Sequence, residues 1–127
     1  TLRNMQFSGR KPQYVIGVAR AAADGLLDAD ELRRLPLEKA IARQVSIRGV
    51  GRWTAEQVLF RALGRVEAIP AGDLGVQKVV ARYCFGKEKV DEDRVRRRAR
   101  RWAPWGALAV TYLFAAWCAD MPPATED

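Results

Sequence analysis

The sequence predicts an all-α protein, and three observations support this fold class. Apolar residues recur at helical spacing in successive segments, and capping residues, prolines and glycines separate these segments. No stretch has the alternating pattern of a strand. The chain has 127 residues, 49% of them hydrophobic and 29% charged, which suits one folded domain with an apolar core.

Four helices are expected in the first half of the chain. The first runs from Lys11 to Asp24, with Pro12 in its first turn and Gly25 as its stop. Asp28 begins a capping box for a short second helix, which Pro36 ends. The other two each have one apolar stripe, and they cover residues 37–45 and 52–63.

The second half continues with helices after a short extended segment. Residues 66–70 are expected to be extended, and Ala71-Gly72 then turns the chain. Asp73 caps a helix that reaches about Tyr83. Asp91 caps another that runs through Trp102.

The last helix is apolar on all sides. Pro104 separates it from the preceding helix, and it covers the 14 residues from Trp105 to Cys118. Because a helix needs about 20 apolar residues to span a bilayer, we expect a buried core helix here. Residues 122–127 are expected to form a tail. The tryptophans assigned to the core are Trp102, Trp105 and Trp117.

Charge and cysteine content restrict the partner and the compartment. Lys and Arg number 22 against 15 Asp and Glu, which gives a net charge of +7 and indicates a polyanionic partner. Nucleic acid is the commonest such partner, although an anionic membrane surface would attract the same charge.

The two cysteines, Cys84 and Cys118, are too few for a disulfide framework or a four-thiolate metal site, so a reducing cytoplasm is expected.

Two glycines separated by one residue lie between the third and fourth predicted helices. Gly49 and Gly51 allow a tight reversal with positive φ, and their backbone permits close approach of a ligand. The helix that starts near Arg52 would point unpaired N–H groups at that place, so main-chain donors could hold a phosphate. Arg52 adds charge and Thr54 adds a hydroxyl. An ordinary helix-to-helix turn would explain the two glycines alone.

The wider string Ile-Arg-Gly-Val-Gly-Arg-Trp-Thr-Ala, residues 47–55, resembles the hairpin of the helix-hairpin-helix (HhH-GPD) DNA glycosylase superfamily. The family pattern is a hydrophobic residue, Pro, Gly, hydrophobic, Gly, two variable residues, Thr and Ala. Arg48 replaces the usual Pro and adds a charge that faces the phosphates. The resemblance implies the family's helical fold and five residues that bind the DNA backbone, which are Arg48, Gly49, Gly51, Arg52 and Thr54.

Asp73 follows Gly51 by 22 residues, in a segment that resembles the one carrying the superfamily's essential aspartate. A carboxylate at a helix N-terminus stays ionised and can stabilise the cation that develops on the sugar when a base leaves. A simple N-cap is the alternative. No second acid has comparable support, and a base alkylated on a ring nitrogen leaves without protonation. The absence of a second acid therefore favours the branch of the superfamily that repairs alkylated bases.

Trp53 occupies the position at which bifunctional members of the superfamily carry a lysine nucleophile. Without an amine there, strand cleavage through a Schiff base is not expected. The cysteine cluster that binds an iron-sulfur centre in some relatives is also absent from the sequence. The resemblance therefore implies a monofunctional hydrolase of the N-glycosidic bond with no lyase activity and no required cofactor.

A second motif is similar to one in the bacterial alkyladenine-type branch, whose members excise 3-methyladenine. Residues 101–105, Arg-Trp-Ala-Pro-Trp, resemble its Arg-Trp-x-Pro-Trp-Arg motif. Gly106 stands where the motif has Arg, which puts in doubt any ion pair or phosphate contact there. The similarity runs from about Phe7 to Trp117. Residues 1–121 then correspond to the C-terminal portion of the family domain, and the wedge residue would lie outside this chain.

Pocket and cation sites also follow from the resemblance. The extruded base would stack on aromatic side chains, and the candidates are Trp53, Tyr112 and Phe114. Core packing is the alternative for Tyr112 and Phe114. A monovalent cation, Na⁺ or K⁺, is expected at the hairpin, bound by the backbone carbonyls of Val45, Ile47 and Gly49.

One helix carries a concentration of arginines, for which a solvated basic face is the default interpretation. They are Arg94, Arg96, Arg97, Arg98, Arg100 and Arg101. Contact with phosphates is an option that the sequence does not decide.

Taken together, the sequence indicates a monomeric glycosylase that acts on damaged duplex DNA in the cytoplasm, at the nucleoid. It would flip an alkylated base out of the helix and hydrolyse its bond to deoxyribose. A non-catalytic module that grips the DNA backbone is the first alternative. A helical domain that binds a membrane surface or another protein is the second.

Overall fold

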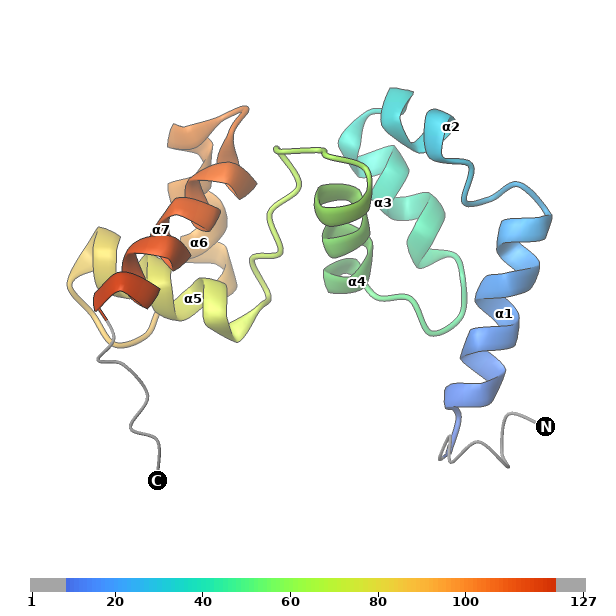
Figure 1. Cartoon of the computed structure of the whole chain (residues 1–127), viewed down its shortest axis with the longest axis horizontal. Coiled ribbons are helices and arrows are strands. Elements are labelled where there is room, and N and C mark those ends of the chain that lie inside the picture. Colours follow the sequence, from blue (N-terminus) through green and yellow to red (C-terminus); the bar gives the residue numbers. More distant parts are fainter. Residues whose placement is uncertain (1–8, 121–127) are drawn as a thin grey trace. The chain divides into compact units, whose positions relative to one another are not determined.

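The computed structural model describes residues 9–120, which are helical and contain no strand (Figure 1). This confirms the predicted all-α class. The chain divides into two compact units, Thr1–Leu63 and Gly64–Asp127. The predicted tail at 122–127 lies outside the described residues.

The first unit contains helices at the predicted places. They are α1 (Lys11–Ala23), α2 (Ala29–Arg34), α3 (Leu37–Val45) and α4 (Arg52–Gln57), and α4 continues as a π-helical turn, η2 (Val58–Ala62). Asp28 caps α2 as expected, because its side chain accepts a hydrogen bond from the Glu31 amide at 2.8 Å.

The core of this unit lies where α2, α3, α4 and η2 bury small and branched side chains. Leu32, Ile41 and Leu59 are buried there, together with the polar side chain of Gln44. Gln44 donates to the carbonyl of Ala40 at 3.3 Å, which satisfies part of its hydrogen-bonding capacity. Helix α1 is less covered, since it buries only Pro12 and Ala21 among its residues.

The second unit begins with an irregular segment instead of the expected extended one. Its residues 68–71 are buried, and turn hydrogen bonds shape the chain on both sides of them. The Ala68 amide donates to the Arg65 carbonyl at 3.0 Å, and the Asp73 amide donates to the Pro70 carbonyl at 2.9 Å. Residues 66–67 therefore lie in a turn where the sequence indicated an extended chain, while residues 68–70 belong to no helix or turn.

Three helices follow this segment. They are α5 (Leu74–Val80), continued by the π-helical turn η3 (Ala81–Phe85), α6 (Glu92–Ala99), continued by the 3-10 turn η4 (Arg100–Trp102), and α7 (Gly106–Asp120). Asp73 caps α5 and Asp91 caps α6, as predicted. The Asp91 side chain accepts from the Arg94 amide at 2.7 Å.

The prediction that the last helix is buried in the core is wrong. Helix α7 buries only Gly106, Ala107 and Val110, while Leu108 and Tyr112 are exposed. Within this unit α5 and η4 pack against α7 and cover part of its surface. Hydropathy alone does not reveal how many neighbours a helix has.

The tryptophans assigned to the core differ in burial. Trp105 is 58% exposed, so its assignment is wrong. Trp102 and Trp117 are half-buried. Among residues 9–120, no helix combines the length and the hydropathy needed to cross a membrane.

Candidate functional site

The hairpin between α3 and α4 is a tight turn. The Ile47 amide donates to the Gln44 carbonyl, and the Val50 amide donates to the Ile47 carbonyl, both at 3.0 Å. Gly49 has a φ of +94°, as predicted, but Gly51 has φ −94° and ψ 172°, which is extended backbone. Only Gly49 therefore uses the conformational freedom of glycine, and Gly51 acts as the N-cap residue of α4.

Gly49 also lies against α1. A β-carbon at this position would be 2.5 Å from Cγ of Tyr14, whereas one at Gly51 would meet nothing within 4 Å. The Tyr14 ring thus occupies the space that a side chain at residue 49 would need. Residue 49 must be glycine both for its φ and for this contact.

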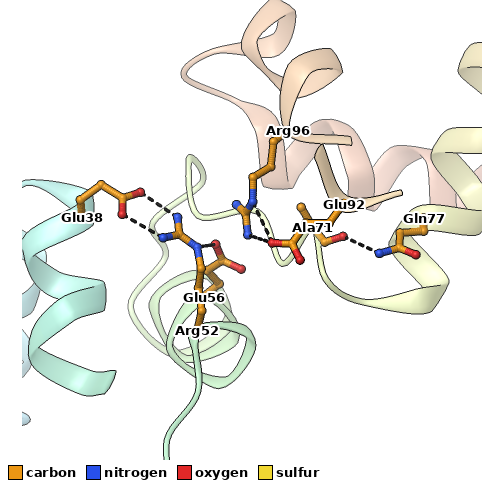
Figure 2. A network of polar contacts seen from close by, with 7 residues as sticks. All are labelled: Glu38, Arg52, Glu56, Ala71, Gln77, Glu92 and Arg96. Atoms are coloured by element: carbon orange, nitrogen blue, oxygen red, sulfur yellow. Dashed lines mark hydrogen bonds and ion pairs between the residues drawn. The ribbon is translucent and has the colours of Figure 1, made fainter. Parts of the chain in front are cut away.

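The two arginines of the hairpin differ in their surroundings. Arg48 is exposed, while Arg52 is held by two carboxylates of its own unit (Figure 2). Arg52 donates to both oxygens of Glu38, at 2.7 and 2.9 Å, and through Nε to Glu56 at 2.9 Å. Hydrogen bonding to Glu38 raises the pKa of the guanidinium; burial opposes this, and the charge of Glu56 adds to it.

This arrangement gives Arg52 a structural task that the sequence did not reveal. Glu56 is 1% exposed, and Arg52 supplies the opposite charge that a buried carboxylate needs. The link to Glu38 also ties α4 to α3. The signal in the sequence was the i, i+4 spacing of Arg52 and Glu56, which favours an ion pair on a helix.

The other two candidates on α4 have different environments. The Trp53 indole is 49% exposed at the start of the helix. Thr54 is half-buried and lines an apolar cavity of about 170 Å³ within the first unit. The other residues that line this cavity are Val18, Leu27, Leu32, Gln44, Val50, Val58 and Leu63.

Asp73 is positioned by the turn before α5 and by the helix itself. Its Oδ1 accepts from the amides of Gly75 at 2.8 Å and Val76 at 3.1 Å. The buried side chain of Gln77 donates to the Ala71 carbonyl at 3.1 Å, which fixes the turn that leads to Asp73 (Figure 2). The carboxylate therefore lies at the positive end of the α5 dipole on a rigid support.

An aromatic side chain of α7 lies beside this carboxylate. A β-carbon at Gly75 would be 3.0 Å from Asp73 Oδ1 and 3.1 Å from Cζ of Phe114. Phe114 also packs against Trp117, with ring centroids 6.1 Å apart and planes inclined by 46°. The second unit thus brings together Asp73 and Phe114, which the sequence placed in one site.

Tyr112 differs from Phe114. Its side chain is 70% exposed, and a residue two positions from Phe114 in a helix lies on a different face.

Gly75 is the residue that sequence reasoning missed. A glycine in the first turn of an apolar helix lowers the stability of that helix relative to alanine. Its presence at residue 75 was the feature of the sequence that could have indicated a close contact there.

Protein side chains offer no evident metal site in the part of the chain that the structure describes. No group of three or more His, Cys, Asp or Glu residues there could hold a metal ion. Cys84 is half-buried and Cys118 is exposed, and both are free thiols.

Comparison with known protein families identifies the superfamily to which the chain belongs. Residues 1–104 match the model of the HhH-GPD superfamily base excision DNA repair proteins. The chain belongs to this family. The predicted resemblance to the HhH-GPD superfamily is thereby confirmed.

Individual HhH-GPD relatives are similar in sequence and structure. DNA-3-methyladenine glycosylase of Bacillus subtilis is 30% identical over 113 residues, which are 89% of this chain and 37% of the relative. The crystal structure of DNA-3-methyladenine glycosidase from Bacillus halodurans has a TM-score of 0.80 and 32% identity, covering 91% of this chain and 53% of that one. The chain thus spans only part of these relatives.

A third relative was solved with nucleic acid. Schizosaccharomyces pombe 3-methyladenine DNA glycosylase, in complex with abasic DNA, has a TM-score of 0.80 and 29% identity. The match covers 98% of this chain and 60% of that one. The similarity therefore includes nearly all of both units of this chain.

Proposed function

We propose that the protein is a monofunctional DNA glycosylase that removes alkylated bases of the 3-methyladenine type from duplex DNA. The observation that carries this proposal is Asp73, held by two backbone amides at the start of α5 beside the ring of Phe114. Membership of the HhH-GPD family and the names of its relatives support the same reaction and the same class of substrate.

Asp73 would stabilise the cation that develops on the sugar. As the bond between C1′ and the base nitrogen breaks, its electron pair leaves with the base and positive charge forms on the deoxyribose. The carboxylate of Asp73 stabilises that charge by electrostatic attraction. The oxygen of a water molecule then bonds to C1′, and one water proton is released. An N3-alkylated adenine leaves as a neutral base, so the reaction needs no separate acid.

The hairpin would hold the DNA backbone while the base is extruded. The turn at Gly49 and the start of α4 supply main-chain donors for a phosphate, and exposed Arg48 adds charge. The guanidinium group of Arg52 already donates hydrogen bonds to Glu38 and Glu56. We therefore assign most of the phosphate binding to the main chain and to Arg48. Gly51 and Thr54 complete the proposed contact.

The aromatic candidates would bind the extruded base. A cationic base gains from stacking on electron-rich rings, and exposed Trp53 presents such a ring. Phe114 is the candidate beside Asp73, while Tyr112 is a further candidate on α7. Since Trp53 has no amine, the enzyme would leave an abasic site without cutting the strand.

The hairpin carbonyls also suit the monovalent cation that the family resemblance implied. Val45 lies in the last turn of α3, where carbonyls lack helical partners, and Ile47 keeps a second lone pair beside its bond to Val50. Bound Na⁺ or K⁺ would add positive charge near a phosphate.

We further propose that the protein acts as a monomer in the cytoplasm, at the nucleoid.

One observation favours the alternative of a non-catalytic module that binds the DNA backbone. Oδ1 of Asp73 already accepts two hydrogen bonds from α5, as a simple N-cap would. In that case the hairpin alone would act, and no base would be released.

The test is release of free base from methylated duplex DNA by the protein, followed by analysis of the strand. The proposal predicts release of 3-methyladenine, with the strand intact until alkali cleaves the abasic site. Strand breaks before alkali would contradict the monofunctional assignment. DNA binding without release from any alkylated substrate would establish the backbone-binding module instead.

A further inference from the structure

Four arginines of α6 and η4 form a surface that the proposed reaction does not use. Arg94, Arg97, Arg98 and Arg101 follow one another at helical spacings of i, i+3, i+4 and i+7, so they share a face. With Phe85 they line a cavity of about 420 Å³ in the second unit. We call this surface, defined by these five residues, the arginine face.

Acidic side chains do not neutralise the arginine face. Within residues 9–120 none of its four guanidinium groups forms an ion pair with a carboxylate. Arg96, on the same helix but outside the face, pairs with Glu92 at 2.6 Å. The four like charges therefore repel one another, and an external polyanion would relieve that repulsion.

Aromatic rings orient two of the four guanidinium groups. The guanidinium carbon of Arg94 lies 4.4 Å from the ring centroid of Phe85, and that of Arg98 lies 5.6 Å from the ring of Trp102. Nε of Arg98 is buried and has no hydrogen-bond partner among the described residues. The rings thus hold two of the four groups in place, and guanidinium N–H groups that no carboxylate engages remain for a ligand.

The chemistry of this face suits phosphates along a strand. A guanidinium group offers paired N–H donors that match the oxygens of a phosphate. Arg94 and Arg101 are seven positions apart in the sequence, so they are separated by roughly 10 Å along the helix axis, at about 1.5 Å for each residue. One DNA strand carries a phosphate for about each 3.4 Å along its axis, so several phosphates would lie within reach.

We propose that the arginine face binds the phosphodiester backbone of duplex DNA as a second contact, distinct from the hairpin. The inference rests on the proposed function to the extent that DNA is the ligand. A membrane surface fits less well, because no residue of α6 or η4 is among the exposed large hydrophobic side chains. The contact carries no sequence preference and adds affinity for damaged and undamaged duplex alike.

The test compares two double variants in binding to undamaged duplex DNA over a series of salt concentrations. Arg97→Gln/Arg101→Gln changes two exposed arginines of the face and leaves both ring contacts intact. Arg20→Gln/Arg34→Gln, on exposed positions of α1 and α2, removes the same charge and is the control. Thermal unfolding confirms that both variants fold.

The first variant is expected to lower the slope of log Kd against log salt by about 2, because each lost phosphate contact removes about one unit. The control should change it by less than half of that. A slope that is unchanged, or that falls equally in both variants, would overturn the inference. If the native protein binds duplex with the predicted slopes but releases no base, the arginine face stands and the proposed activity fails.

Discussion

Asp73 and Phe114 converge on Gly75 from two helices. A β-carbon at residue 75 would lie 3.0 Å from the carboxylate Oδ1 and 3.1 Å from Cζ of the ring. A side chain at this position would therefore force the carboxylate or the ring to shift by a few tenths of an ångström, although the two residues are 41 positions apart in the sequence (114 − 73).

Gly75→Ala is expected to lower base release at least about 10-fold, because a shift of the carboxylate by a fraction of an ångström costs transition-state stabilisation. The free energy of unfolding should change by less than about 1 kcal/mol, since alanine's helix propensity offsets the tighter contact. Single-turnover base release and thermal unfolding measure the two quantities. The control is Gly17→Ala in α1, where a β-carbon meets nothing within 4 Å. Equal release by both variants would contradict this account of the site.

The two hairpin glycines should respond oppositely to the same substitution. Gly49→Ser places a side chain at φ +94° and against Tyr14, so it is expected to destabilise the protein by about 2 kcal/mol and to weaken DNA binding. Gly51→Ser adds a good N-cap residue to extended backbone in open space and should be neutral or stabilising. Denaturant unfolding measures the difference, and similar losses in both variants would refute it.

Arg52→Lys tests whether this arginine supports the fold. Lysine keeps the charge but cannot reach both Glu38 and Glu56 with the same geometry. Because Glu56 is 1% exposed while Arg52 is 41% exposed, we expect a loss of about 1–2 kcal/mol in the free energy of unfolding. Arg33→Lys, in an exposed pair with Asp30 at 3.1 Å, should cost less than about 0.5 kcal/mol. A DNA-binding defect with unchanged stability would instead assign Arg52 to the phosphate.

Trp53→Ala tests the stacking of the extruded base. Loss of one stacking ring is expected to raise KM for methylated DNA by about 10-fold, since base–aromatic stacking contributes roughly 1–3 kcal/mol. Trp105→Ala, which also removes an exposed indole, is the matched control and should leave KM unchanged. Steady-state kinetics on one substrate distinguish the two. If both variants behave alike, Trp53 has no special contact with the base.

The local signals in the sequence predicted much of this fold. Helix ends at Gly25 and Pro36 and the caps at Asp28, Asp73 and Asp91 depend on residues close in the chain, and the structure confirms them. The tight reversal expected at the two hairpin glycines is also local, and the positive φ of Gly49 confirms it. Such features depend on φ, ψ and hydrogen bonds within one turn.

Features that depend on distant neighbours could not be predicted. The apolar composition of α7 indicated burial, but the packing around it decides which side is covered. Trp105 is exposed for a related reason, since hydropathy gives no direction to a side chain. Phe114 lies near Gly75, and Arg52 pairs with Glu38. Both contacts join residues that are distant in the sequence, and local sequence patterns do not predict such contacts.

The central claim is that Asp73 is catalytic and not only a cap, and its most direct test compares Asp73→Asn with Asp91→Asn. Both aspartates cap helices, and asparagine caps equally well, so both variants should fold and bind duplex DNA like the native protein. We predict that Asp73→Asn lowers the single-turnover rate of base release by roughly 10²-fold or more, whereas Asp91→Asn leaves it unchanged. Base release by Asp73→Asn at the native rate would contradict the claim and leave Asp73 as a structural cap.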